Sequence, residues 1–346
     1  MPTGVLPRRA GRRTNLGLLA LLLLAGATGV LAFGVGTPLH ARVVAAAHGA
    51  AGLGLLLLVP WKSVVVRRSR ARTRGRRDPV VAWALAVLVV LTLATGVLHT
   101  VAGAAVGIPS WGVLQLHVAL GVGTGLLVVL HAAGSRQRPR RADASRRVLL
   151  QAGGLAAGAL ALWGAVEGVL RLTGAPGAQR RATGSHERGS GDPAAMPVTQ
   201  WFTDTVPAEP GRTLELVAAG RRTRLRAADL DRGDTLTAVL DCTGGWYAEQ
   251  EWRGVRLDRL LAGTDLPDGG SVDVVSVTGY RRRLPLADAA SLLLATHCGG
   301  EPLSAGHGAP VRLVAPGRRG YWWVKWVARV EVVDAPWWAQ PPVPLR

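Results

Sequence analysis

Long apolar runs separated by short polar segments fill the first half of the chain. A helix that crosses the hydrocarbon core of a bilayer needs about 20 mostly apolar residues, because each residue advances the helix by about 1.5 Å. Several runs reach this length: residues 15–37, 42–66, 79–102, 111–134 and 148–173. This pattern predicts an all-α transmembrane bundle of five helices.

The pattern changes at about residue 197. Beyond it, short runs bounded by turns predict strands, and two stretches have helical spacing. The expected strands are 213–218, 236–240, 271–277, 311–314 and 322–333, and the helical stretches are 257–261 and 286–294. We therefore expect a multi-domain chain in which a soluble α+β domain, residues 197–346, follows the transmembrane bundle. Residues 174–196 are rich in Gly, Ala, Ser and charge, which predicts a flexible linker.

The net charge of +19 is concentrated in the apolar half of this 346-residue chain. Residues 1–196 contain 23 Lys and Arg against 5 Asp and Glu, whereas residues 197–346 contain 18 against 17. Positive charge confined to loops between apolar segments is typical of membrane topology. We therefore expect a lipid bilayer as the surrounding medium and no nucleic-acid partner.

The basic loops predict an orientation. Arginines cluster before the first span, after the second and after the fourth, whereas the other two short loops contain only Arg42. Since positive charge stays on the cytoplasmic side, residues 1–14 form a cytoplasmic N-terminus and the fifth span leads the soluble domain outwards. The chain is expected to be a multi-pass protein of the plasma or inner membrane with an extracytoplasmic C-terminal domain.

Residues 135–173 combine the last basic loop with the fifth span. The segment Ser145-Arg146-Arg147-Val148-Leu149-Leu150 in front of that span resembles a twin-arginine export signal. That export route carries domains that are already folded, often around a cofactor. The alternative is an ordinary run of positive charge before a helix.

An internal repeat relates the first four spans, residues 15–134. Ala27–Leu31 recurs as Ala94–Leu98, and His48, with glycines four and six residues later, recurs as His117 with the same spacing. Spans two and four run in the same direction, so both histidines lie at matching depth. A haem iron can be held by two imidazoles, and ionisable residues inside a membrane are by default functional. We expect His48 and His117 to ligate one haem b; the alternative is glycine-mediated packing with histidines bonded to neighbouring helices.

Other membrane histidines give weaker indications. His131 lies about 21 Å further along the helix than His117, as a second stacked haem would require, but Lys62 stands where the repeat places its partner. His40 and His99 fall at the outer edge, where a haem propionate, a quinone or water could contact them. A second haem therefore stays open. Residues 15–134 resemble the four-helix bis-histidine b-type cytochromes that serve as quinone-linked anchors, which implies a membrane quinone or another electron carrier as partner.

The soluble half contains both cysteines, Cys242 and Cys298. Composition leaves open a disulfide between them or a metal-binding thiolate. Cys242 lies between a predicted strand and a Gly-rich turn, in AVLDCTGGWYAEQEWRGVRLDRLL. With the later segments HGAPVR and WVKW, this stretch resembles the molybdopterin-binding domain of the sulfite oxidase family, which includes periplasmic methionine sulfoxide reductase catalytic subunits. The resemblance covers about residues 197–335.

The resemblance implies roles for several side chains. Cys242 would be the thiolate that binds molybdenum, and a soft sulfur suits such a metal. His307 and Arg312 match the HG-x-P-x-R motif that contacts the pterin and its phosphate, which an arginine can bind with two nitrogens. Further pterin contacts are the VKW segment and an earlier turn. They correspond to Trp323, Val324 and Lys325, and to Phe202 and Thr203.

Some positions depart from the family pattern. Thr203 stands where the family usually has a basic or amide residue, and Gly299 replaces the usual Asn before Gly-Glu-Pro-Leu. No motif marks the substrate contacts. Tyr280 and Arg281 are the nearest candidates for a tyrosine and a cation that face an oxyanion; the alternative is a strand end exposed to water.

Together these features predict a membrane-bound, molybdopterin-dependent oxidoreductase. It would perform oxygen-atom transfer on a small oxyanion or a sulfoxide and exchange electrons with the quinone pool through haem b. The direction, sulfite-type oxidation or sulfoxide reduction, stays open. The alternatives are a non-catalytic electron-relay anchor for a partner redox enzyme, and a transporter whose membrane histidines move protons.

Overall fold

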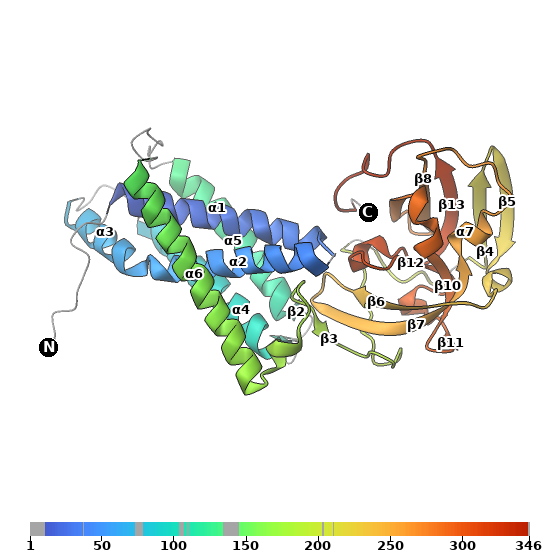
Figure 1. The fold of residues 1–346 in the computed structure, drawn as a ribbon, viewed down its shortest axis with the longest axis horizontal. Helices are drawn as coiled ribbons and strands as arrows, with labels where there is room; N and C mark the ends of the chain where they lie inside the picture. Colours follow the sequence, from blue (N-terminus) through green and yellow to red (C-terminus); the bar gives the residue numbers. More distant parts are fainter. Residues whose placement is uncertain are drawn as a thin grey trace. The chain divides into compact units, whose positions relative to one another are not determined.

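The structure, a computed structural model, describes residues 11–36, 38–72, 79–103, 107–108, 111–133, 145–202, 204–209 and 211–344. The chain divides into two compact units: the first ends at Gly184, and the second begins at Ser185 and also includes the short segment 34–37. In Figure 1 the first unit is the set of blue to green helices, and the second contains the yellow to red strands. The helical and strand-rich halves of the sequence thus fold separately.

Apolar helices dominate the first unit. They are α1 (Arg12–Gly34), α2 (Pro38–Leu57), α3 (Val59–Arg72), α4 (Pro79–Ala102), α5 (Val113–Ala133) and α6 (Arg146–Thr173). Among the described residues, five of these helices, all except α3, are long and apolar enough to cross a membrane. The five helical spans expected from the sequence are therefore present as helices. A short hairpin, β1 (Gly107–Ile108) and β2 (Trp111–Gly112), precedes α5, and a 3-10 turn, η3 (Pro176–Gln179), follows α6.

The second span is shorter than the sequence pattern predicts. The apolar run 42–66 is divided at Leu58, whose N–H donates to the carbonyl of Leu55 at 3.1 Å. Pro60 explains the break, because it has no N–H to continue a helical ladder and is tolerated in the first turn of a new helix. α2 therefore ends at Leu57 and α3 carries the basic residues onward.

Small residues bring the helices of this unit into close contact. α2 packs on α6, and α4 packs on α5. A Cβ at Gly49 would lie 2.4 Å from the indole of Trp163, so glycine is what admits that side chain. Between α4 and α5, the hydroxyls of Thr92 and Thr124 lie 3.1 Å apart. Close backbone approach and polar contacts of this kind are typical of helix packing in membranes.

Two sheets form the second unit. The first has the order β11-β10-β7-β3, with β12 also paired to β10 and β6 to β7; the second has the order β5-β4-β13-β8-β9. The strands of the first are β3 (His186–Glu187), β6 (Asp234–Asp241), β7 (Trp246–Arg256), β10 (Leu293–Cys298), β11 (Glu301–Pro302) and β12 (Arg312–Val314). Those of the second are β4 (Thr213–Ala218), β5 (Arg221–Arg226), β8 (Ser271–Ser276), β9 (Arg281–Pro285) and β13 (Val327–Val333). Short helical turns connect them: η4 (Ala227–Leu230), α7 (Leu257–Leu260), η5 (Leu286–Ser291), η6 (Ala305–His307) and η7 (Gly320–Trp322).

Two expected elements take a different form. The stretch 286–294 is a 3-10 turn followed by the start of β10 rather than a helix, and 322–333 is a strand only from Val327. The second difference has a local cause. Trp326 adopts φ +49°, a left-handed conformation that interrupts a strand. The preceding residues are thereby released from the sheet and form a loop.

The expected flexible linker is only partly a linker. From Ser185 onward the chain is ordered against the second unit: β3 pairs in parallel with β7, with His186 opposite Trp246. Ser185 is fully buried. The edge of β7 accounts for this order, because its unpaired backbone groups bind a neighbouring extended segment, and the N–H of Arg188 donates to the carbonyl of Tyr247 at 2.8 Å.

Gly254, where β7 pairs with β10, allows a test of this fold. A Cβ there would lie 2.0 Å from the carbonyl oxygen of Leu294, so the two strands would have to separate. We expect Gly254→Ala to lower the free energy of unfolding of the second unit by about 1–3 kcal/mol, measured by urea unfolding followed by tryptophan fluorescence. Gly211→Ala is the control, since its Cβ would lie 3.8 Å from the nearest atom. Equal stability of the two variants would contradict the assigned register.

Candidate functional site

Cys242 lies in the tight turn between β6 and β7. Its N–H donates to the carbonyl of Trp246 (2.8 Å), and its carbonyl accepts from the N–H of Gly245 (3.1 Å). Gly245 has φ +90°, which a residue with a Cβ rarely adopts. The turn brings the N–H of Gly244 close to the thiol, so that it donates to Sγ at 3.3 Å. Strand, cysteine and glycine turn thus follow one another as the sequence predicts.

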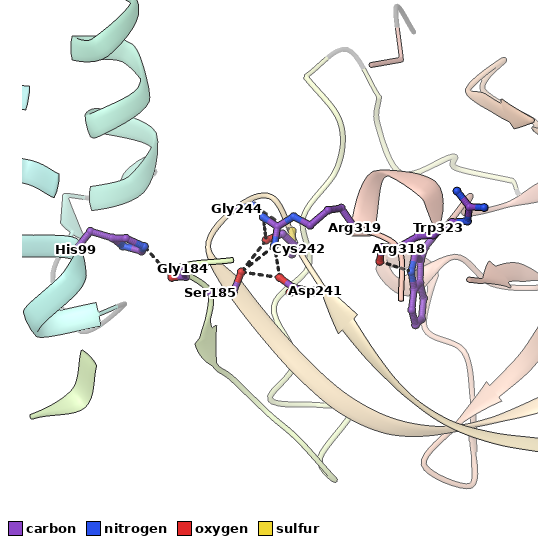
Figure 2. A network of polar contacts seen from close by, with 9 residues as sticks. All are labelled: His99, Gly184, Ser185, Asp241, Cys242, Gly244, Arg318, Arg319 and Trp323. Carbon is purple, nitrogen blue, oxygen red and sulfur yellow. Dashed lines mark hydrogen bonds and ion pairs between the residues drawn. The ribbon is translucent and has the colours of Figure 1, made fainter. Parts of the chain in front are cut away.

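A buried polar cluster fixes this turn (Figure 2). Asp241 forms an ion pair with Arg319, and the two side chains are 6% and 2% exposed. Ser185 Oγ donates to Asp241 Oδ1 (2.6 Å) and to the carbonyl of Cys242 (3.3 Å). Arg319 Nη2 donates to the same carbonyl at 3.3 Å. Sequence reasoning missed this cluster because its members come from three segments that are distant along the chain.

Burial and the neighbouring charges have opposite effects on the pKa of the Cys242 thiol. Burial raises the pKa of this thiol, whereas the N–H of Gly244 and the cations of Arg319 and Lys325 lower it. A thiolate is the form that binds a metal, and it needs positive charge nearby when it is buried. The turn therefore provides the donor and the charges that a metal-bound cysteine requires.

Lys325 is held in a polar niche next to this turn. Its Nζ donates to the carbonyls of Thr199 (2.9 Å) and Gly306 (2.6 Å). Burial and, to a smaller extent, the positive charge of Arg312 lower the pKa of Lys325 to about 7. An ammonium has three N–H donors, and the described residues supply acceptors for two of them. The third donor is available to an anionic ligand.

Arg312 is a buried cation without a hydrogen-bonded partner on two of its nitrogens. It is 1% exposed, and neither Nε nor Nη1 has an acceptor among the described residues. Its guanidinium lies 4.9 Å from the ring centre of Trp252 and 5.6 Å from that of Trp323. Burial lowers the pKa of Arg312 to about 10. Because leaving buried donors unsatisfied is costly, this arrangement fits a bound anion such as a cofactor phosphate.

His307 is engaged differently from what the resemblance implies. Its Nδ1 lies 2.8 Å from Ser304 Oγ, and its Nε2 lies 3.1 Å from the carbonyl of Met196. Both ring nitrogens thus make contacts within the protein. The side chain of His307 joins η6 to the segment that contains Met196, and a role in binding a pterin stays a prediction.

The other expected pterin contacts divide into buried and exposed ones. Trp323 and Val324 are buried, and Val324 accepts a backbone hydrogen bond from Leu313 at 2.7 Å. Phe202 is 90% exposed, and Thr203 lies outside the described residues. In that turn Trp201 is the residue that packs inward, with its ring centre 6.4 Å from Tyr280. We therefore assign no inward contact to Phe202.

The two cysteines are not joined in a disulfide. Both Cys242 and Cys298 are free thiols, and Cys298 is buried at the end of β10. Burial raises the pKa of Cys298 to about 11. Burial raises the pKa of Cys242 as well, but a backbone N–H and the cations Arg319 and Lys325 act in favour of a thiolate there, so Cys242 is the better candidate for a metal ligand.

The tyrosine expected near the substrate is buried, but the arginine beside it is not. The hydroxyl of Tyr280 donates to the carbonyl of Tyr321. Arg281 is exposed, and a role for it as a cation that faces an oxyanion stays a prediction. Side chains alternate along β9, and Arg282 is the buried residue, at 1% exposure. The sequence shows the two-residue period of a strand but does not show which face is buried.

In the first unit the structure brings His48 and His117 together. Their ring centres lie 5.9 Å apart, with planes at 89°. Each Nδ1 is hydrogen-bonded to a backbone carbonyl one helix away: His48 to Ala25 at 3.0 Å and His117 to Thr92 at 2.9 Å. A metal-bound histidine usually donates its other ring N–H in this way. Two imidazoles that share one metal through bonds of about 2 Å have ring centres about 6 Å apart, so the pair fits an iron between them.

The Ala-Thr-Gly-Val-Leu segments of the repeat lie against the two histidines. A Cβ at Gly29 would lie 3.3 Å from Cε1 of His48, and a Cβ at Gly96 would lie 2.9 Å from Cε1 of His117. The glycines of the Ala-Thr-Gly-Val-Leu repeat therefore make room for the imidazoles. Of the remaining candidates, His99 has its Nε2 2.9 Å from the carbonyl of Gly184. Nothing in the described part of the chain assigns His40 or His131 to a second haem.

Comparison with known proteins agrees with the resemblance of the second unit. Residues 212–340 match the profile of the family described as "Oxidoreductase molybdopterin binding domain". Human mitochondrial sulfite oxidase is 48% identical over 120 residues, which cover 30% of this chain and 22% of that protein. Barley (Hordeum vulgare) nitrate reductase [NAD(P)H] is 38% identical over 98 residues, which cover 23% of this chain and 11% of that protein. The chain thus matches less than a quarter of the length of these relatives.

Similar solved structures were also found. The sulfane dehydrogenase SoxCD from Paracoccus pantotrophus is 28% identical, with a TM-score of 0.33, and the match covers 36% of this chain and 38% of that one. The sequence matches, rather than this structural similarity, bear out the expected type of domain. The family match does not include the helical unit, since it begins at residue 212.

The charges around Cys242 give a pH-dependent prediction. Arg319 lowers the pKa of the Cys242 thiol, so Arg319→Met should move the pH profile of its alkylation to higher pH. The measurement is the iodoacetamide rate of the full chain produced without molybdopterin. Arg319→Met combined with Asp241→Asn controls for the carboxylate left unpaired. An unchanged profile in both variants would show that Arg319 does not act on the thiol.

Proposed function

We propose that this chain, whose residues 212–340 form a molybdopterin-binding oxidoreductase domain of the sulfite oxidase and nitrate reductase type, is a membrane-anchored molybdenum enzyme. It performs oxygen-atom transfer on a small oxyanion or a sulfoxide. Electrons pass between that centre and the membrane quinone pool through a haem b in the helical unit. The observation that carries the proposal is a free, half-buried thiol near Lys325 and Arg312, two cations that form no ion pair within the described residues.

The residues of the second unit account for the binding of such a centre. Cys242 provides the thiolate, and Arg319 and the N–H of Gly244 stabilise its charge. The free donors of Arg312 and Lys325 bind the anionic part of the cofactor. Trp252 and Trp323, whose ring centres lie 4.9 and 5.6 Å from the Arg312 guanidinium, shield it from water. When bound, a molybdenum–molybdopterin group supplies two-electron oxygen-atom transfer.

The chemistry needs an electron carrier in either direction. Oxidation of sulfite with water to sulfate releases two electrons and two protons, and reduction of a sulfoxide to a sulfide consumes them. A quinone accepts two electrons and a quinol supplies two, whereas a haem iron transfers one at a time. The matched histidines, each oriented by a backbone carbonyl, support a haem in this role.

Length, hydropathy and charge support a membrane location. Five helices can cross a bilayer, and the arginines before α1, after α3 and before α6 lie on alternate loops. This predicts a cytoplasmic N-terminus and an extracytoplasmic second unit. Arg146 and Arg147, the first residues of α6, fit the proposed twin-arginine signal for export of an already folded domain.

Removal of the thiolate tests the molybdenum centre. In Cys242→Ser we expect loss of at least about 99% of sulfite- or sulfoxide-driven redox change of the haem, because a hydroxyl does not replace a thiolate as a soft ligand. The haem spectrum should stay intact. The measurement combines metal analysis with anaerobic visible spectroscopy of the purified chain, and Cys298→Ser is the matched control. Full activity in Cys242→Ser would refute the assignment.

Removal of either imidazole tests the haem. We expect His48→Ala or His117→Ala to abolish the Soret absorption of a low-spin haem, or to convert it to a high-spin form, because one axial ligand is missing. Gly96→Leu should do the same, since its side chain would occupy the place of the His117 ring. His40→Ala serves as a control at the helix edge. An unaltered spectrum in both histidine variants would rule out this pair.

A further inference from the structure

Thr199 lies beside the cysteine turn but belongs to a segment that the family match does not include. That match begins at residue 212, whereas Ser185 and Thr199 precede it. Ser185 Oγ donates to the carbonyl of Cys242 at 3.3 Å. The carbonyl of Thr199 accepts from Lys325 Nζ at 2.9 Å. The segment in front of the matched domain therefore contributes to the surroundings of the proposed cofactor site.

The hydroxyl of Thr199 already accepts one hydrogen bond. The indole Nε1 of Trp246 lies 3.1 Å from Thr199 Oγ1. An indole N–H can only donate, so the threonine oxygen is the acceptor in this bond and its own hydrogen stays available for another group. Lys325 holds the backbone carbonyl of the same threonine, and a β-branched side chain is stiff at χ1. The direction of the remaining O–H is therefore restricted.

The thiol of Cys242 is an acceptor for this hydrogen. A Cβ at Gly244 would lie 3.5 Å from Cys242 Sγ and 3.6 Å from the indole nitrogen of Trp246, so the sulfur and the indole border the same glycine. The Thr199 hydroxyl, which is bonded to that indole, also hydrogen-bonds to the thiol and acts to lower its pKa. The N–H of Gly244 donates to the same sulfur at 3.3 Å. The sulfur thus has a backbone donor and a side-chain donor.

Donors to a coordinating sulfur change the properties of the metal that it binds. A hydrogen bond withdraws electron density from the thiolate and stabilises the reduced form of the metal site, which carries more negative charge. The N–H of Gly244 is part of the backbone and is present whatever the side chain. A side-chain donor is different, because valine has nearly the shape of threonine but no O–H. The donor at Thr199 is therefore a property of this residue that substitution can remove.

We propose that Thr199 is a positioning residue for the metal-binding cysteine: its hydroxyl, oriented by Trp246, donates to Cys242 Sγ and raises the reduction potential of the bound molybdenum. This inference rests on the proposed function, since it names a residue that sets the potential of that site. A higher potential makes the metal centre a better acceptor of electrons from its substrate. In the alternative role, Thr199 only provides an acceptor for the buried indole of Trp246.

The reduction potential of the metal centre tests this proposal in the purified, molybdenum-loaded full chain. A redox titration followed by the paramagnetic resonance signal of molybdenum compares the wild type with Thr199→Val and Thr199→Ser. Loss of one hydrogen bond to a charged sulfur should lower the equilibrium constant for one-electron reduction about 3- to 30-fold in Thr199→Val, which corresponds to about 30–90 mV. Thr199→Ser keeps the hydroxyl and should stay within about twofold of the wild type. Thr237→Val, at an exposed threonine on β6, is the matched control.

A second measurement does not depend on the loaded enzyme. It uses the full chain produced without molybdopterin, with Cys298→Ser as the background so that Cys242 is the one cysteine that reacts. Thr199→Val should slow the alkylation of Cys242 by iodoacetamide about 2- to 5-fold near neutral pH, because the smaller fraction of thiolate outweighs its greater nucleophilicity. Thr199→Ser should react at the rate of the parent chain. Circular dichroism of each variant establishes that it is folded.

The outcomes separate this inference from the proposed function. An unchanged potential together with an unchanged alkylation rate in Thr199→Val would overturn the role of Thr199 and leave the enzyme assignment standing. Equal shifts in Thr199→Val and Thr199→Ser would also overturn it, since the hydroxyl would then not be the cause. A chain that binds no molybdenum would refute the proposed function, while the alkylation rates would still decide whether Thr199 acts on the sulfur.

Discussion

The second unit buries more positive than negative charge near its cysteine, and much of its architecture follows from this imbalance. Arg312, Arg282 and Lys325 lack carboxylate partners among the described residues, and Arg319 alone shares a buried ion pair with Asp241. Each unpaired cation is kept in place by aromatic rings or backbone carbonyls rather than by acids. Such an arrangement is costly in the absence of a ligand and becomes favourable once anions bind. The domain is therefore organised around negative charge that it does not itself contain.

The Asp241–Arg319 ion pair fixes the position of the turn that carries Cys242. It ties the end of β6 to η7, and Ser185 extends it to the segment that leaves the helical unit. The carbonyl of Cys242 accepts from both Ser185 and Arg319, so the turn that carries the thiol has little freedom. A ligand atom held by buried hydrogen bonds of this kind is preorganised for a metal. What the sequence suggested as a linker is therefore partly a component of the site.

In the helical unit, the same contacts position each of the two proposed ligand histidines. Each proposed ligand histidine is served by the preceding span, which supplies a backbone carbonyl for Nδ1 and a glycine against the ring. His48 relies on α1, and His117 relies on α4 in the same manner. Two equivalent helix pairs thus present two imidazoles with the same tautomer, which is the requirement for symmetrical ligation of one metal. The repeat in the sequence corresponds to these two equivalent helix pairs.

Sequence alone determined those features that depend on neighbours along the chain. Hydropathy over about 20 residues identified the five long helices, because that pattern is local. Alternation identified β4, β6, β8, β12 and part of β13, but not β5, β7, β9 or β10. The motifs around Cys242 and Arg312 identified the type of domain, which the family profile confirms. The His48 and His117 pair was predicted because a repeat makes two distant segments comparable. The break at Leu58 was missed although Pro60 signals it.

Only the tertiary structure decided which side chains meet. The pairing of Asp241 with Arg319 and the contact of Ser185 with the cysteine turn join residues more than fifty positions apart. Whether Arg281 or Arg282 faces inward depends on which side of β9 is covered, and here the C-terminal segment covers the side of Arg282. No local pattern contains this information, because burial is a property of the assembled fold. The sequence fixes the period of a strand, and packing alone selects the face on which the charge is buried.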